Sequence, residues 1–223
     1  MLPFGSNDIF REFLAYNNSI WPMPIIGYAL GLIAVISMSY ENKLSDRMIA
    51  LVLGFFWMWI GVMQQITFFS QIIPWANLFG ILFIVQSFLI LWFGVLLNRL
   101  QFRVTFSGYN LIGIIFIIYS LVAYPLIGFF TGHVYPSTAV FGIAASPTAI
   151  FTFGMFLFTE DQFPTLLLYI PLVWSLLGFA TSMATGMHED FALFVAGISC
   201  FWLTLLKNRK NHNKKESMEH DFD

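Results

Sequence analysis

The sequence predicts an all-α protein, a polytopic bundle of about seven transmembrane helices with the N-terminus outside and the C-terminus in the cytoplasm. Two observations predict this class. Of 223 residues, 58% are hydrophobic and only 10% charged, against about 25% charged in soluble domains. The stretches from Met48 to Asn98 and from Val104 to Thr159 contain no Asp, Glu, Lys or Arg, whereas a run of about 18 apolar residues already indicates a membrane span. The chain is therefore expected in a lipid bilayer.

The uncharged stretches divide into seven segments of span length. The stretch from Met48 to Asn98 would form a helix about 76 Å long, more than twice the ~30 Å hydrocarbon core, so it must fold back once. Ser70, Gln71, Pro74 and Asn77 mark that turn. The predicted spans are Trp21–Tyr40, Met48–Ile72, Trp75–Leu97, Leu111–Phe130, Ala139–Phe158, Pro164–Thr185 and Phe191–Leu206.

The basic residues predict the orientation, because positively charged loops stay on the cytoplasmic side of a membrane. With seven spans, nine of the ten basic residues fall on one side: Lys43, Arg47, Arg99, Arg103, Lys207, Arg209, Lys210, Lys214 and Lys215. Arg11, before the first span, falls on the other side. Six spans, with the last segment lying on the membrane, would instead place the most basic segment outside.

The first part of the chain is predicted to form an N-terminal interfacial helix over residues 1–20. Ile9, Phe10, Phe13 and Leu14 lie close together at helical spacing in this segment. The seven-span domain then covers residues 21–206.

Two other segments outside the spans differ in pattern. Residues 207–223 are polar without periodicity, which predicts a basic then acidic disordered cytoplasmic tail whose basic start favours anionic lipid. Residues 100–107 alternate apolar and polar side chains, which favours an extended ribbon. An irregular interfacial loop is the alternative there, and the formal net charge of −2 gives no argument for a nucleic-acid partner.

Several short motifs are spread over nearly the whole chain before the tail. They are Tyr16-Asn17 with Trp21-Pro22, the GHxYP motif Gly132-His133-Val134-Tyr135-Pro136, the PTxIFTFG motif Pro147-Thr148-Ala149-Ile150-Phe151-Thr152-Phe153-Gly154, Ile170-Pro171 with Trp174, and Glu189-Asp190. In these motifs the sequence resembles a family of bacterial multi-pass membrane proteins known only as a domain of unknown function. The resemblance implies a location in the bacterial inner membrane and supplies no catalytic residues.

None of the seven predicted spans carries an Asp, Glu, Lys, Arg or His in its interior. Charges within membranes mark proton relays, ion paths and voltage sensors, so their absence argues against proton coupling through titrating side chains. A retinal protein needs a lysine within a span, and a haem carrier needs paired histidines on its spans. Neither is present, and no cofactor is predicted.

Polar residues converge on the predicted outer face in the loops after the fourth and sixth spans. His133 lies in the first loop, and His188, Glu189 and Asp190 lie in the second. Histidine with carboxylate can ligate a metal, act as acid and base, or respond to pH. These four residues are candidates for a metal site or an enzyme. The alternative is that they are ordinary loop polarity, with Glu189 and Asp190 favourably placed before a helix N-terminus.

A second set of polar residues lies within the spans. Gln64 and Gln65 are adjacent amides that cannot face the same direction, so at least one should point into protein, where interhelical hydrogen bonding and a polar substrate site are the two interpretations. In the fifth span, Pro147 is expected to interrupt the helix near mid-membrane, and Pro171 to interrupt the sixth. Ser146, Thr148 and Thr152 could pack helices or line a solute path beside the interrupted helices.

Three classes of function follow from these observations. The first is transport of a small uncharged solute along Gln64, Gln65, Ser146, Thr148 and Thr152. The second is an accessory role in the membrane, through a protein partner or a homo-oligomer in contact with the lipid bilayer. The third is an outer-face metal-binding protein or enzyme. The apolar composition favours the first two.

Overall fold

The computed structural model describes residues 5–160 and 162–220, and this part of the chain is helical throughout apart from its connections. In chain order, the elements are α1 Ser6–Ser19; α2 Met23–Ser37; α3 Lys43–Trp59, extended by the π-helix η1 Ile60–Phe68 and the 3-10 turn η2 Phe69–Gln71; α4 Ala76–Leu91, extended by η3 Trp92–Leu96; α5 Gly108–Ile118, η4 Tyr119–Ala123 and α6 Tyr124–Thr131; α7 Ala145–Phe156; α8 Leu166–Thr185; η5 His188–Asp190; and α9 Phe191–His220.

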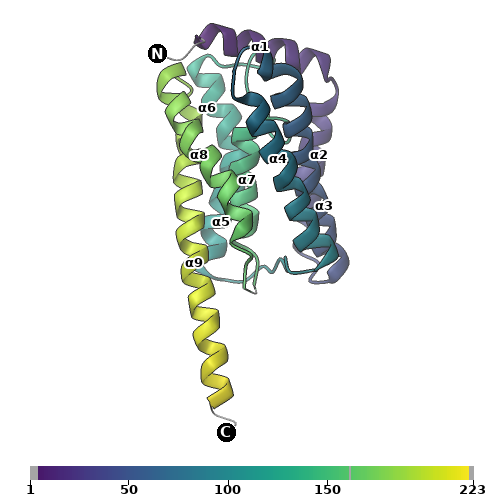
Figure 1. Ribbon diagram of the computed structural model, residues 1–223, viewed down its shortest axis with the longest axis vertical. Helices are drawn as coiled ribbons and strands as arrows, with labels where there is room; N and C mark the ends of the chain where they lie inside the picture. Colours follow the sequence, from purple (N-terminus) through teal and green to yellow (C-terminus); the bar gives the residue numbers. More distant parts are fainter. Residues whose placement is uncertain (1–4, 161, 221–223) are drawn as a thin grey trace.

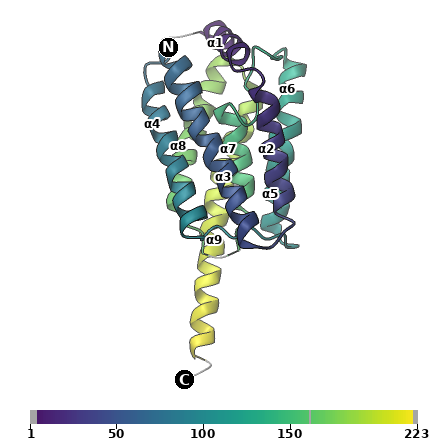
Figure 2. The same ribbon diagram turned by 90° about the vertical axis from the view of Figure 1, so that its right-hand side faces the viewer.

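The long helices form one bundle, with α1 lying across one end and α9 extending beyond the other (Figures 1 and 2). We call these the α1 end and the α9 end. All seven predicted spans contain a helix, which confirms the all-α prediction. Among the described residues, five helices are long and apolar enough to cross a membrane, or six if α1 and α2, which meet at a bend of 83°, count as one span. The number of spans and the orientation stay predictions.

Helix α7 forms the centre of the bundle, with every residue buried, and it packs against α3, α5, α8 and α9. At 12 residues it is about 18 Å long, which is shorter than a bilayer core. The predicted fifth span is therefore only partly helical. Gly142 has a φ of +80°, and Pro147 is the third residue of α7, where a missing N–H breaks no helical bond. The expected mid-membrane interruption at Pro147 was wrong.

A non-helical segment, residues 132–144, leads from the α1 end down to α7, and most of its inner half is buried. Buried irregular backbone needs partners for its polar groups, and α1 supplies them. The Tyr16 hydroxyl donates to the Ile143 carbonyl at 2.6 Å, and Asn17 Nδ2 donates to the carbonyls of Pro136 and Thr138 at 2.6 and 2.8 Å. Helix α1 thus fixes the segment that positions the start of α7.

Helix α8 continues through Pro171 without a break, so the predicted interruption of the sixth span was wrong. Proline lacks an N–H, and the carbonyl of residue 167 loses its helical partner. Gln86 on α4 replaces that partner, because its Nε2 donates to the Leu167 carbonyl at 2.9 Å from a fully buried position. A neighbouring helix therefore satisfies the backbone, as in membrane helices that contain proline.

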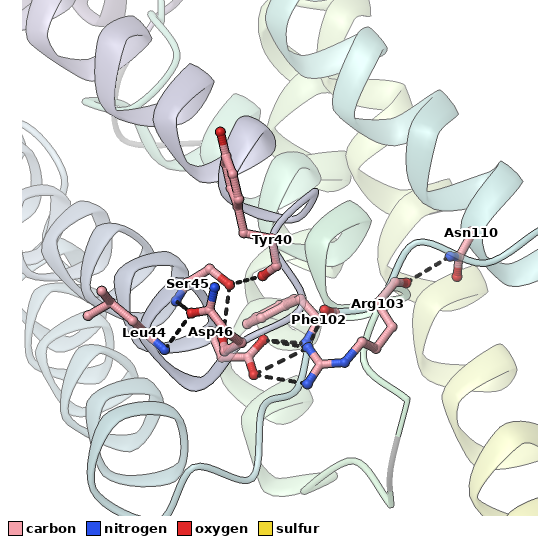
Figure 3. Close-up of polar contacts among 8 residues, drawn as sticks. Tyr40, Leu44, Ser45, Asp46, Phe102, Arg103 and Asn110 are labelled. Carbon is pink, nitrogen blue, oxygen red and sulfur yellow. Dashed lines mark hydrogen bonds and ion pairs between the residues drawn. The ribbon is translucent and has the colours of Figure 1, made fainter.

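The α9 end is closed by an ion pair between Asp46, in the first turn of α3, and Arg103, in the connection after η3 (Figure 3). Asp46 Oδ1 accepts from Arg103 Nη1 at 3.0 Å and from the Phe102 N–H at 2.9 Å. Asn110 Nδ2 donates to the Arg103 carbonyl at 3.0 Å. Phe102 also forms an isolated antiparallel bridge with Thr159, and the rest of residues 100–107 is irregular. The segment therefore has one extended contact within the irregular loop that was the alternative prediction.

The C-terminal tail differs from the prediction. Helix α9 runs without interruption through the basic residues to His220, whereas the polar composition predicted disorder from residue 207. Lys, Arg, Glu and Met are good helix formers, and the apolar first part of α9 already supplies the nucleus that an isolated helix lacks. The polar tail therefore extends an existing helix.

Candidate functional site

A cavity of about 420 Å³ lies near the α1 end of the bundle. Helix α1 covers it with Ile9 and Phe13. Its walls come from η1, η2, the turn before α4, α4, α8 and the start of α7. The remaining lining residues are Gln64, Gln65, Phe69, Ile73, Trp75, Phe79, Ala139, Ala145, Ser146, Trp174, Leu177, Ala180, Thr181, Met187 and Asp190. This volume falls in the range of small-molecule sites, which are mostly apolar with a few convergent polar groups.

Both glutamines of the predicted pair lie in the wall of this cavity, only 3% and 4% exposed. Gln64 Oε1 accepts from the Ala145 N–H, the first of α7, at 2.9 Å. Gln65 has no hydrogen-bond partner among the described residues. Both amides are buried, which confirms the prediction that at least one of them points into protein. They lie in the π-helix η1, whose wider turn rotates less per residue than an α-helix, so both can reach the same cavity wall. One amide holds the scaffold, and its neighbour remains available to a ligand.

Trp174 on α8 supplies a second available hydrogen-bond donor. Its ring packs edge-on against Phe79 and Phe83, with centroids 5.3 and 5.2 Å away. Its Nε1 is buried and has no acceptor within the part of the chain that the structure describes. A buried indole N–H without an acceptor costs free energy, and since Trp174 also lines the cavity, an acceptor on a bound molecule could remove that cost.

The start of α7 forms the polar side of the cavity through Ala145 and Ser146. A helix N-terminus carries a partial positive charge. Here it lies beside Asp190, whose Oδ1 accepts from the Tyr124 hydroxyl at 2.7 Å. The Asp190 carboxyl group and the Gln64 side-chain oxygen Oε1 therefore already lie at the helix end, so the cavity does not favour an anion.

Thr148 and Thr152 do not line this cavity, although both were predicted beside a solute path. Thr148 Oγ1 accepts from the Gly142 N–H at 2.9 Å. Thr152 Oγ1 accepts from Trp57 Nε1 at 3.1 Å and donates to the Thr148 carbonyl at 2.8 Å. Both side chains are fully buried. They hold α7 to its surroundings, which matches the packing alternative.

The predicted outer-face cluster is only partly assembled. His133 Nδ1 lies 3.0 Å from Glu189 Oε1, and the Phe10 ring covers the imidazole at 4.8 Å. His188 is exposed and contacts the Phe191 ring instead. No group of three or more His, Cys, Asp or Glu side chains close enough to hold a metal ion occurs among the described residues. The geometry supports a buried His133–Glu189 contact between the 132–144 segment and η5.

Comparison with known proteins adds the family. The chain matches the family of unknown function DUF6064 over residues 7–215. The protein belongs to this family. No curated protein and no solved structure gives a match. The family assignment confirms the resemblance to a domain of unknown function and supplies no activity.

In this DUF6064 protein, most of the motif residues that can be assigned a role stabilise the helical bundle. Tyr16 and Asn17 hold the 132–144 segment. Gly132 ends α6 with a left-handed φ of +89°. Gly154 lies where α5 and α7 cross, since a Cβ on it would come within 2.9 Å of the Gly113 carbonyl oxygen. Of the motif residues, Trp174 and Asp190 also line the cavity.

Several residues of this DUF6064 protein were not identified as important from sequence. In the sequence, no local pattern distinguishes Gln86 from the other polar residues of the predicted spans. The Leu167 carbonyl that it binds is far away along the chain. Asp46 lies between the first two predicted spans in the sequence, but it is buried in α3. A possible signal for both was available: a proline inside a span requires a donor on a neighbouring helix, and a carboxylate close to an apolar run requires a cationic partner.

Proposed function

We propose that this protein is a multi-pass protein of the bacterial inner membrane that binds a small, uncharged, amphipathic molecule in the cavity at its α1 end, as the binding step of solute transport. The observation that carries the proposal is the pair Gln65 and Trp174. Both line one apolar cavity, and both have hydrogen-bonding groups without a partner among the described residues. A ligand with one polar group and an apolar body matches this lining.

The charge of the lining supports an uncharged ligand. Of the described residues in the cavity wall, Asp190 is the one with an ionisable carboxyl group, and none is Lys, Arg or His. An anion would lie near a carboxylate with no cation to offset the loss of its hydration. Gln65 presents both a donor and an acceptor, and Trp174 presents a donor. The site is suited to a hydroxyl, amide or carbonyl compound.

A matched pair of ligands tests the proposal. Octanamide and octanoate have the same chain and differ in charge. In the purified protein, octanamide should raise the melting temperature with a saturating dependence on concentration, and octanoate should not. Gln65→Leu should abolish the shift. Thr152→Ser, outside the cavity, should retain it. Equal shifts with both ligands, or an unchanged shift in Gln65→Leu, would refute the proposed site.

The orientation is tested separately. In a Cys200→Ala background, cysteines at Gln71, near the α1 end, and at Asn213 in α9 should react with an impermeant maleimide from opposite sides of the membrane. Both positions are exposed. We expect Gln71→Cys to label in intact cells and Asn213→Cys only after permeabilisation, because the basic residues gather at the α9 end. Labelling of both positions from one side would contradict the proposed topology.

A further inference from the structure

A second cavity, also of about 420 Å³, lies at the α9 end, away from the ligand cavity described above. Three segments meet there: the turn after η3, the connection that leads into α8, and α9. It is lined by Arg99, Gln162, Phe163, Pro164, Thr165, Asn208, Arg209 and His212. No residue of this set lines the cavity at the α1 end. The two cavities therefore call for separate ligands.

The walls of the α9-end cavity are rigidly connected. Asn208 holds the α8 connection through two hydrogen bonds with Phe163, accepting from its N–H and donating to its carbonyl, both at 2.9 Å. One turn away on α9, Asn211 Nδ2 donates to the Glu160 carbonyl at 3.0 Å. On the other wall, the Arg99 N–H donates to the Phe93 carbonyl at 2.8 Å. These contacts fix the backbone positions from which Arg99 and Arg209 project.

The guanidinium groups of Arg99 and Arg209 form no ion pair with any side chain that the structure describes. Arg103, by contrast, is committed to Asp46 at the same end of the bundle. Helix α8 also begins at this cavity, and its N-cap residue Thr165 makes no side-chain capping bond. Two guanidinium groups without an ion-pair partner among the described side chains, beside a helix N-terminus without a side-chain cap, form an electropositive site.

Apolar surface adjoins this charge. Leu97 lies two residues before Arg99, and Leu166 follows Thr165 directly; these leucines are 43% and 47% exposed. Leu96, Tyr169 and Trp202, on the elements η3, α8 and α9 that meet at the cavity, are exposed as well. A ligand that fits both parts has a phosphate head and an apolar body. Basic pockets between membrane helices on the cytoplasmic side bind anionic lipid head groups in this way.

We propose that the α9-end cavity binds the phosphate of an anionic phospholipid, with Arg99 and Arg209 as the phosphate ligands and the acyl chains along Leu97 and Leu166. The arginines act as planar donors to the phosphate oxygens. The lipid joins the end of η3 to α9, two elements that the Asp46–Arg103 pair does not connect. The proposal is independent of the ligand in the cavity at the α1 end.

Native mass spectrometry of the full chain with equal amounts of phosphatidylglycerol and phosphatidylcholine tests this site. The wild type should retain phosphatidylglycerol preferentially. Each of Arg99→Gln and Arg209→Gln should weaken that binding about five-fold, and the double variant about 25-fold, since a basic residue near an anionic surface contributes about 1 kcal/mol. Arg47→Gln removes the same charge from the same end but outside the cavity, and should change binding less than two-fold.

The other outcomes would overturn the proposal. If Arg47→Gln weakens binding as much as Arg99→Gln, the attraction is diffuse charge and the cavity is not a site. If 10 mM inorganic phosphate displaces the lipid completely, the site recognises a free anion. A second double variant, Arg99→Lys with Arg209→Lys, is used if the glutamine double variant loses its helical circular dichroism. The lysines keep the charge but not the paired donors of a guanidinium group. If the lysine variant binds the lipid as tightly as the wild type, the assigned arginine geometry is wrong.

Discussion

The two ends of the bundle differ in whether their buried polar groups have hydrogen-bond partners. At the α9 end, Asp46 is almost fully buried and engages both Arg103 and the Phe102 N–H. At the α1 end, Gln65 is also buried, and the Nε1 of the partly buried Trp174 is enclosed. Neither amide nor indole N–H has a partner among the described residues, and both residues line a cavity. The first arrangement closes the structure around its polar groups. The second leaves hydrogen-bonding capacity for a ligand.

The difference shows that burial of a polar side chain does not by itself indicate its role. A buried group that is fully paired stabilises one packing arrangement. Its removal leaves the former partner buried without a hydrogen bond, which lowers the free energy of unfolding. A buried group that faces an empty cavity has no partner to lose. Substitution of a buried polar residue should therefore lower the stability of the protein at the α9 end. At the α1 end it should instead change ligand binding.

The largest effect is expected from Asp46→Ala. It leaves the guanidinium of Arg103 without its carboxylate and the buried Phe102 N–H without an acceptor, and breaking such a pair costs about 3–5 kcal/mol. The free energy of unfolding in mixed detergent micelles measures this loss. Asp46→Asn retains an acceptor for Phe102 and should lose less. A cost below about 1 kcal/mol for Asp46→Ala would contradict the importance of this pair.

A smaller effect should separate the two adjacent glutamines. Gln64→Leu removes the acceptor of the buried Ala145 N–H at the start of α7, and an unpaired buried donor costs about 1–3 kcal/mol. Gln65→Leu removes no hydrogen bond and adds apolar contact, so the free energy of unfolding should be unchanged or slightly higher. Similar destabilisation by both substitutions would show that Gln65 has a structural partner, and the cavity would lose its main available amide.

The sequence was sufficient to predict the helical class and a helix in each of seven segments, because apolar runs bounded by charge have few alternatives in a bilayer. It was less informative about the shape of those helices. The 12 buried residues of α7 were predicted as part of a longer span, since the six residues before it, 139–144, are also apolar. The backbone of the irregular segment, residues 132–144, is satisfied by Tyr16 and Asn17, more than a hundred residues earlier, and no local pattern reveals such a partner.

The site was predictable to the extent that polar residues in apolar helices are few. Gln64, Gln65 and Ser146 were identified in this way, and all three line the cavity. Thr148 and Thr152 carried the same signal but bond within the core, because a hydroxyl can turn to a nearby backbone group as readily as to a solute. Trp174 was noted only as part of a motif, because a tryptophan in a predicted span is usually interpreted as an apolar side chain that packs between helices.

The smallest effect concerns Thr152, which lies in the closed core between the two ends. Thr152→Val removes the acceptor of the buried Trp57 indole N–H and should cost about 1–2 kcal/mol of unfolding free energy. Thr152→Ser keeps that hydroxyl and should recover most of the loss. Neither substitution should change octanamide affinity, because Thr152 does not line the cavity. A different result would contradict this separation: octanamide binds more weakly to Thr152→Val, and Thr152→Ser restores the stability but not the octanamide affinity. The ligand site would then extend into the core, and the packed centre would not be distinct from the open α1 end.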